Sequence, residues 1–217
     1  MIRTTLTALL LSTTALAAPL PQQARIVYDV LSGSTKLGVA EQNWTLQDKR
    51  YRLETELTPW LGPRLRYLSE GELGRQGLRP ESYQEFRGNG DKPRRSVRFD
   101  WQANTARFDQ SEDKLGSGTQ DANAFVFQLT FLGDRKEASF PVATAKRLRD
   151  ERLQQVDSSS FTLGARKLDV RIWRSADPSR RTEVWLAPQL HNLPVKLIRS
   201  DDDNEFQFVA RTVEVQP

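Results

Sequence analysis

The chain has 217 residues, with 32 Lys and Arg against 28 Asp and Glu, a formal net charge of +4, a single histidine and no cysteine. The absence of cysteine excludes disulfides, thiol chemistry and zinc–thiolate sites. Acidic and basic residues are interleaved along the chain, whereas nucleic-acid-binding proteins concentrate basic residues in a patch or stripe, so we expect no nucleic-acid partner.

The N-terminal residues have the three parts of a secretory signal peptide. Arg3 supplies the positive charge, and a short apolar stretch ends at the small-x-small cleavage pattern ALA at 15–17. The apolar stretch is too short for a membrane anchor, since a spanning helix needs about 20 mostly apolar residues. We therefore predict a cleaved signal peptide over 1–17 and a single exported domain over 18–217, with no transmembrane segment after the signal is removed.

Most of the chain alternates polar and apolar residues with the period of a β-strand. Leu53, Thr55 and Leu57, for example, alternate with Glu54 and Glu56. Such strands have one buried and one wet face, as is usual in antiparallel sheets. Short turn sequences separate them and indicate a meander. The expected strands cover residues 24–31, 36–46, 50–58, 65–73, 80–87, 94–101, 105–109, 150–157, 166–174, 181–187, 194–200 and 205–215.

One segment, QDANAFVFQLTFLGD at 120–134, is nearly continuously apolar. Asp121 is a suitable N-cap for a helix and Gly133 a suitable C-terminal residue. The helix between these two residues would be apolar on nearly all of its faces, so we expect it to be buried. Its length of roughly 18 Å is too short to span a bilayer. The predicted fold is therefore mainly β: a single curved antiparallel sheet, a meander or half-barrel, with one apolar helix in its concave face.

Three stretches resemble a family of exported proteins from Gram-negative bacteria that is known only as a domain of unknown function. They are RRSVRFDWQANTARFDQSEDKLGSGTQD at 94–121, FTLGARKLDVRIWR at 161–174 and RTEVWLAPQLHNLPVKL at 181–197. The family tends to continue Gln-Asp with Leu-Ser, where this chain has Ala122 and Asn123. The resemblance implies a periplasmic envelope location and a curved sheet similar to periplasmic lipoprotein carriers, and it implies no activity.

The sequence contains no set of residues typical of an enzyme, and we assign no catalytic residue, metal ligand or cofactor. His191 is the only histidine, whereas catalytic triads and metal sites need partners for it. Glu54 with Glu56, and Glu70 with Glu72, are carboxylate pairs that share a strand face, as a glycosidase would require. Neighbouring arginines make cross-strand ion pairs the favoured interpretation, and an enzyme is the least favoured function.

Two functions remain open. In the first, the protein binds or carries an apolar, lipid-like ligand. Its candidate contacts are Phe125, Phe127, Leu129 and Phe131 of the helix, together with the loop residue Trp60. In the second, it is an envelope scaffold or interaction protein without a small-molecule ligand, and the helix only fills the core. A carrier needs a water-accessible apolar cavity of a few hundred cubic ångströms, whereas a scaffold needs a filled core with an exposed patch or sheet edge.

Overall fold

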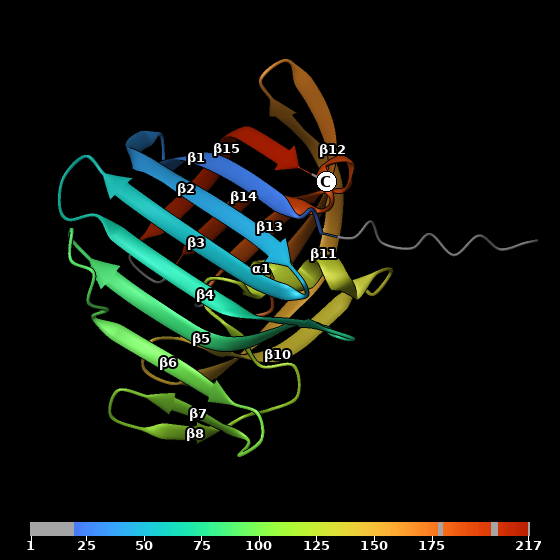
Figure 1. Cartoon of the computed structure of the whole chain (residues 1–217). Helices are drawn as coiled ribbons and strands as arrows, with labels where there is room; N and C mark the ends of the chain where they lie inside the picture. Colours follow the sequence, from blue (N-terminus) through green and yellow to red (C-terminus); the bar gives the residue numbers. More distant parts are fainter. Residues whose placement is uncertain (1–19, 178–179, 201–203, 217) are drawn as a thin grey trace, which may run out of the picture.

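The computed structural model describes residues 20–177, 180–200 and 204–216. The predicted signal peptide at 1–17 lies outside the described residues. Within them, one sheet of 15 strands forms most of the structure, and a single short α-helix lies inside its curve (Figure 1).

The first eight strands follow one another across the sheet as antiparallel neighbours. They are β1 (Gln23–Ser32), β2 (Thr35–Gln47), β3 (Arg50–Pro59), β4 (Leu65–Gly74), β5 (Gly77–Arg87), β6 (Arg95–Asp100), β7 (Thr105–Phe108) and β8 (Glu112–Lys114). In β3, Tyr51, Leu53 and Thr55 are buried and the residues between them are partly exposed. The period-2 pattern therefore places the core-facing residues correctly.

The remaining strands begin at the opposite edge of the sheet and return to β1. They are β9 (Gln120–Asp121), β10 (Glu137–Ala143), β11 (Leu148–Leu163), β12 (Arg166–Ser175), β13 (Thr182–Ala187), β14 (Leu193–Ser200) and β15 (Glu205–Gln216), with the 3-10 helix η2 (Pro188–Leu190) after β13. β15 pairs with β1, with Tyr28 opposite Ala210. The last strand thereby joins the two halves of the sheet.

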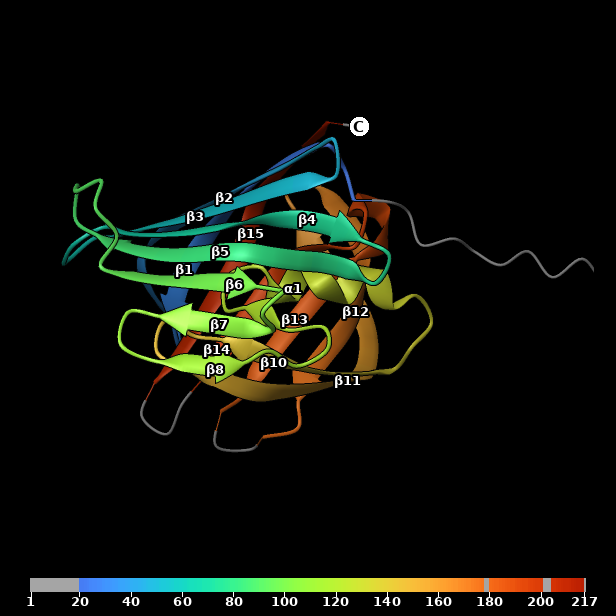
Figure 2. The same cartoon turned by 60° about the horizontal axis from the view of Figure 1, so that its bottom comes forward.

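The sheet is rolled but does not close into a barrel. Its two edge strands, β8 and β9, are separated in the chain only by residues 115–119. β9 lies against β5 rather than pairing with β8, and the Gln120 side-chain amide donates to the carbonyl of Leu78 (2.8 Å). Figure 2 brings β6, β7 and β8 forward, and the Leu148 amide at the start of β11 donates to the Asp113 carboxylate of β8 (3.0 Å).

Curvature of the sheet depends on positions where a side chain cannot fit. Gly71 in β4 lies opposite Pro80 in β5, next to a shift in the pairing register. A Cβ atom at Gly71 would lie 2.3 Å from the carbonyl oxygen of Arg79, far inside contact distance. Glycine here lets the two backbones approach closely while the strands bend.

The predicted fold class is confirmed, with corrections at one edge. The strands β8, β9 and β10 are absent from the prediction, and β9 pairs with β10 in parallel rather than antiparallel fashion. Pro141 interrupts the strand pattern of β10, since proline cannot donate to a ladder. It is tolerated because β9 pairs only with Val142 and Ala143 on that side. β11 is also longer than the predicted 150–157.

The apolar segment forms α1 (Phe125–Gln128), which continues as the 3-10 helix η1 (Leu129–Leu132). The predicted single helix from Asp121 to Gly133 is therefore wrong in its start and in its continuity. It starts later because the Asp121 carboxylate accepts hydrogen bonds from the amides of Asn123 and Ala124 (both 2.9 Å) in a turn before α1. Gly133 ends η1 at φ +60°. All four α1 residues are buried, and α1 contacts β5 on one side and β14 on the other, so it lies in the concave face as predicted (Figure 1).

The packed region of the interior is the part that α1 fills. Phe127 stacks on Trp44 with ring centroids 5.2 Å apart, and Trp44 stacks on Tyr51 at 5.5 Å. The Trp44 indole donates to the carbonyl of Pro21 (2.9 Å), so its one polar atom is paired. These aromatic rings give the short helix most of its anchoring to the sheet.

Candidate functional site

The interior also contains a cavity of about 320 Å³ on the other side of α1. Val126 of α1 forms part of its wall, and strands from both halves of the sheet contribute the rest. Leu57, which also lines it, pairs with Leu65 next to the loop between β3 and β4. The cavity therefore extends from α1 toward that end of the roll.

Much of the cavity wall is aromatic or aliphatic, and its polar groups are mostly paired. Tyr28 and Phe208 meet edge to face, with ring centroids 6.4 Å apart. The Tyr28 hydroxyl lies within hydrogen-bond distance of two acceptors, Gln42 Oε1 (2.8 Å) and the carbonyl of Pro194 (2.9 Å), and donates its one proton to either. Gln42 in turn donates to Thr55 Oγ1 (3.2 Å). Burial raises the pKa of the Tyr28 phenol, which therefore stays neutral.

Two arginines line the same cavity without a carboxylate partner. The Arg199 guanidinium donates to the carbonyl of Ala122 (3.0 Å) and lies over the Phe125 ring, 5.2 Å from its centroid. The Arg149 side chain makes no hydrogen bond to another described residue, and the Nε atoms of both arginines are buried and unpaired. Among the described residues, no carboxylate lies within 4.0 Å of either guanidinium, unlike the arginines of the outer surface.

The electrostatics around the arginines follow from their burial. Burial, and then the nearby charge of Arg149, lower the pKa of Arg199. Burial raises the pKa of the Glu151 carboxyl, and the charges of the two arginines oppose that shift. Glu85 also lines the cavity, where it accepts a hydrogen bond from the Tyr83 hydroxyl (2.8 Å). The two arginines thus place two positive charges close together in a partly desolvated space.

A buried polar cluster lies beside the cavity, and Asn123 belongs to both. Asp121 is fully buried and accepts a hydrogen bond from the Ser69 hydroxyl (2.6 Å) in addition to those from the turn before α1. The Asn123 side chain donates to the carbonyl of Leu53 (3.1 Å). Burial raises the pKa of Asp121 to about 6, although these hydrogen bonds oppose the shift. The cluster ties β9 and the start of α1 to β3 and β4.

Comparison with known proteins places the chain in a family. A family model described as a protein of unknown function (DUF3108) matches residues 27–211, which is most of the chain. The chain belongs to the DUF3108 family. The predicted resemblance to a domain of unknown function is confirmed to that extent. No curated protein matches this DUF3108 chain.

A solved structure shares the fold. It is the crystal structure of a β-barrel-like protein of the domain of unknown function DUF1849 from Brucella abortus. The similarity covers 93% of this DUF3108 chain and 100% of the other, with a TM-score of 0.64 and 11% sequence identity. At that identity the likeness concerns the fold alone.

None of the five candidate ligand contacts is among the residues that line the cavity of this DUF3108 protein. Phe125, Phe127 and Leu129 are buried in the core, and Phe131 is partly buried against it. Trp60 lies in the loop after β3, is 65% exposed and has the Lys36 ammonium 6.0 Å from its ring centroid. The structure thus brings the four helix residues together and leaves Trp60 apart from them. Their role in binding stays a prediction.

The sequence analysis did not identify the charged residues of the cavity, because they fit the alternation of polar and apolar residues that is typical of a strand. In β14, Arg199 is in phase with Leu197 and Val195, and in β5, Glu85 is in phase with Tyr83. A charged residue at a core-facing position of a strand was the available signal, since such residues are rarely buried without a partner.

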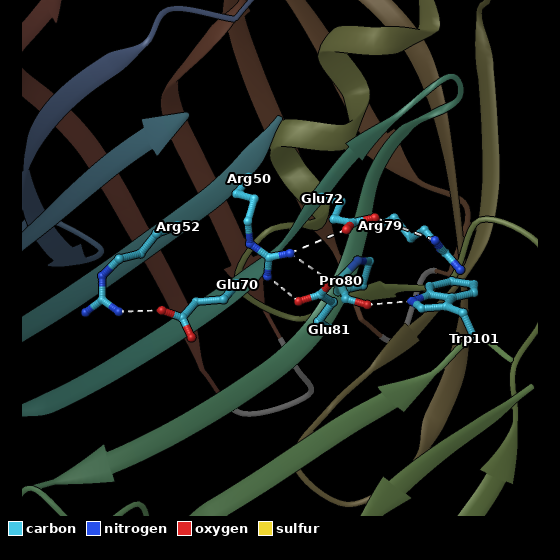
Figure 3. Close-up of polar contacts among 8 residues, drawn as sticks. All are labelled: Arg50, Arg52, Glu70, Glu72, Arg79, Pro80, Glu81 and Trp101. Atoms are coloured by element: carbon cyan, nitrogen blue, oxygen red, sulfur yellow. Dashed lines mark hydrogen bonds and ion pairs between the residues drawn. The ribbon is translucent and has the colours of Figure 1, made fainter. Parts of the chain in front are cut away.

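The carboxylate pairs lie on the outer face of the sheet and form the predicted cross-strand ion pairs. Figure 3 shows Arg52 paired with Glu70 (2.7 Å), and Arg50 between Glu72 (3.4 Å) and Glu81. On the same face the Trp101 indole donates to the carbonyl of Pro80 (2.7 Å) (Figure 3). Every carboxylate in this set is partly exposed and paired with an arginine.

Two further features bear on function. No group of three or more His, Asp or Glu side chains in the described ranges is arranged to hold a metal ion. His191 follows η2 in a left-handed conformation and is half-buried. In the described part of the chain, no helix has the length and apolar character required to cross a membrane.

Proposed function

We propose that this DUF3108 protein is a periplasmic carrier that binds an apolar, lipid-like molecule in its interior cavity. The observation that carries this proposal is a space of about 320 Å³ beside an otherwise packed core, walled by Leu57, Val126, Leu197 and Phe208. Ligand pockets in proteins span roughly 300–1,000 Å³. A scaffold whose helix only fills the core needs no such space, so the cavity favours the carrier over the scaffold.

The size of the cavity limits the ligand. At about 320 Å³ it lies at the lower end of the range of ligand pockets. A single acyl chain, or the end of a longer one, suits a space of this size better than a lipid with two full chains does.

The periplasmic location rests on the N-terminal sequence and is tested separately. We expect the protein from its own host to appear in the periplasmic fraction with a mass that lacks residues 1–17. A full-length protein in the cytoplasmic fraction would contradict this part of the proposal and leave the cavity unaffected.

Binding is tested with N-phenyl-1-naphthylamine, a neutral apolar fluorophore that brightens when it leaves water. We expect saturable binding by the purified mature protein and loss of that binding in Ala40→Phe, because Ala40 is fully buried and lines the cavity. The matched control is Ala103→Phe, which adds the same side chain in an exposed turn and should leave binding unchanged. Leu57→Phe fills the same space from β3 and replaces Ala40→Phe if that variant does not fold.

Two outcomes would overturn the carrier proposal. One is the absence of saturable binding to folded wild-type protein. The other is equal binding by wild type and by a folded cavity-filling variant, which would place the fluorophore elsewhere. Either result would favour the scaffold, and cross-linking for an envelope partner would then be the next experiment.

A further inference from the structure

The two arginines of the cavity are partly buried, and neither has a carboxylate within 4.0 Å among the described residues. Arg149 and Arg199 both contribute a buried Nε atom with no hydrogen-bond partner. Buried charges in proteins are generally paired and hydrogen-bonded, since leaving one unpaired costs several kcal/mol in principle. We therefore expect a bound molecule to supply the hydrogen-bond acceptors that these two guanidinium groups lack.

The carboxylates nearest to the arginines do not fill this role. Glu85 lines the cavity but accepts the Tyr83 hydroxyl, and Glu151 follows Arg149 in β11. Neither lies within ion-pair distance of Arg149 or Arg199 in the described residues, where every ion pair found involves other arginines or Lys36. Positive charge thus exceeds negative charge at the cavity wall, two guanidinium groups against the one carboxylate of Glu85.

The donors point to one kind of chemical group. Guanidinium N–H groups form their strongest hydrogen bonds with carboxylate and phosphate oxygens. Tyr67 also lines the cavity, and its hydroxyl has no hydrogen-bond partner among the described residues. The other wall, with Tyr28, Leu57 and Phe208, is suited to a hydrocarbon chain. Polar and apolar recognition are therefore separated within one cavity.

We infer that the ligand is a single-chain amphiphile whose anionic head group, a carboxylate or a phosphate, is bound by Arg149 and Arg199. The inference rests on the proposed carrier function and adds the charge of the ligand to it. The chain of the amphiphile lies along the wall formed by Leu57, Val126 and Phe208, and the Tyr67 hydroxyl donates a third hydrogen bond to the head group.

The test compares ten-carbon ligands that differ only in the head group. Decanoate, decyl phosphate, decanol and decyltrimethylammonium are titrated against bound N-phenyl-1-naphthylamine at pH 7.5, below their micellar concentrations. We expect the anions to bind about tenfold or more tightly than decanol, since a hydrogen bond to a charged group is worth that much in affinity. Decyltrimethylammonium should bind most weakly. The tighter of the two anions identifies the head group, because a phosphate preference and a carboxylate preference are separate results.

Arg149→Gln is the decisive variant, because no described residue depends on Arg149 for a hydrogen bond. We expect it to lower the affinity for the preferred anion by about tenfold while decanol binds as before. Arg135→Gln, which removes an equal charge from an exposed turn, should change neither. Arg199→Lys keeps the positive charge but loses the planar guanidinium. It should lower the affinity for the preferred anion by a smaller factor than Arg149→Gln does.

The outcomes separate this inference from the carrier proposal. If decanol binds as tightly as both decanoate and decyl phosphate, or if Arg149→Gln weakens decanol and the preferred anion alike, the anionic head group is wrong and the carrier stands. If neither the fluorophore nor any of the four amphiphiles binds, both fail together. A selective loss of the anion in Arg149→Gln, with no change in Arg135→Gln, supports the inference.

Discussion

The packed region around Phe127 and the cavity around Arg199 lie side by side in one rolled sheet and are built from the same elements. Along β2, Trp44 lies in the packed region, whereas Gln42 and Ala40 on the same face line the cavity. In α1, Phe127 stacks on Trp44 and the preceding residue, Val126, lines the cavity. Successive helical residues point about 100° apart, so one short helix borders both regions.

The comparison shows what divides a core from a cavity in this fold. The packed region combines large rings with the helix that covers them. The Trp44 indole and the Gln128 amide there are hydrogen-bonded, whereas the buried Tyr51 hydroxyl has no partner among the described residues. The cavity has smaller or polar residues at equivalent positions, such as Ala40 and Thr55, and Val126 is the α1 residue that lines it. A rolled sheet of this size encloses more space than its own side chains fill, and the position of α1 decides which part stays empty.

The largest expected difference between the two regions is in the free energy of unfolding. We expect Phe127→Ala to reduce it by about 3–5 kcal/mol, because a fully buried ring leaves a new void. Phe208→Ala removes a partly buried ring from a wall that already faces open space, and should cost less than half as much. Urea denaturation of both variants measures the difference. Equal losses would show that the cavity is collapsed in solution.

The second effect is pH-dependent and comes from Asp121 at the border of the two regions. Its pKa is about 6 in the folded protein, against 3.8 for the free group. The folded state therefore binds the proton more tightly, and this carboxyl favours folding below about pH 4 and loses that contribution as pH rises to about 6. A difference of about 2 pKa units corresponds to about 3 kcal/mol.

Asp121→Asn isolates that contribution. We expect the unfolding free energy of the wild type to fall relative to that of Asp121→Asn between pH 4 and pH 7, and the difference to be constant above that range. The difference in unfolding free energy between the two proteins removes the contributions that other carboxylates make to both. One of these is Glu183, whose lowered pKa of about 2 acts in the opposite direction. Parallel curves across pH 4–7 would contradict the raised pKa.

A third comparison removes polar groups from each region. Gln128 accepts a hydrogen bond from the Leu78 amide and donates to the carbonyl of Gln76 (both 2.7 Å) in the packed region. We expect Gln128→Leu to cost about 2 kcal/mol, because both backbone groups lose their partner away from water. Tyr28→Phe should cost less than about 1 kcal/mol, since water in the cavity can replace its hydroxyl. Thermal or urea unfolding that ranks them in reverse would contradict this difference.

The smallest effect concerns the arginines of the outer surface. Arg52 pairs with Glu54 and Glu70 at 2.7 Å each, but its side chain is 43% exposed. A double-mutant cycle of Arg52→Ala and Glu70→Ala should give a coupling energy of about 0.5 kcal/mol or less, reduced further by salt. A coupling well above 1 kcal/mol would mean that the outer ion pairs contribute as buried ones do.

The local order of residues was sufficient to predict most of the sheet. Alternation such as that of Leu53, Thr55 and Leu57 identifies a strand and its buried face without any knowledge of its neighbours, because the side-chain period of a strand is 2. The continuous apolar character of the segment after Asp121 likewise indicated burial. Short or proline-containing strands, such as β9 and β10 with Pro141, carry too little pattern to be recognised.

The pairing of β15 with β1, the inward position of β9 and the cavity were decided by the tertiary structure. Each depends on which strands meet across the roll. The period-2 alternation of β2 is the same at Trp44, which Phe127 covers, and at Gln42, which faces the cavity. Arg149 and Arg199 are far apart in the chain and read locally as ordinary strand residues. Only the rolled sheet places them in one cavity, where no carboxylate of a described residue lies within 4.0 Å of either guanidinium, and that placement turns two common residues into a candidate anion-binding site.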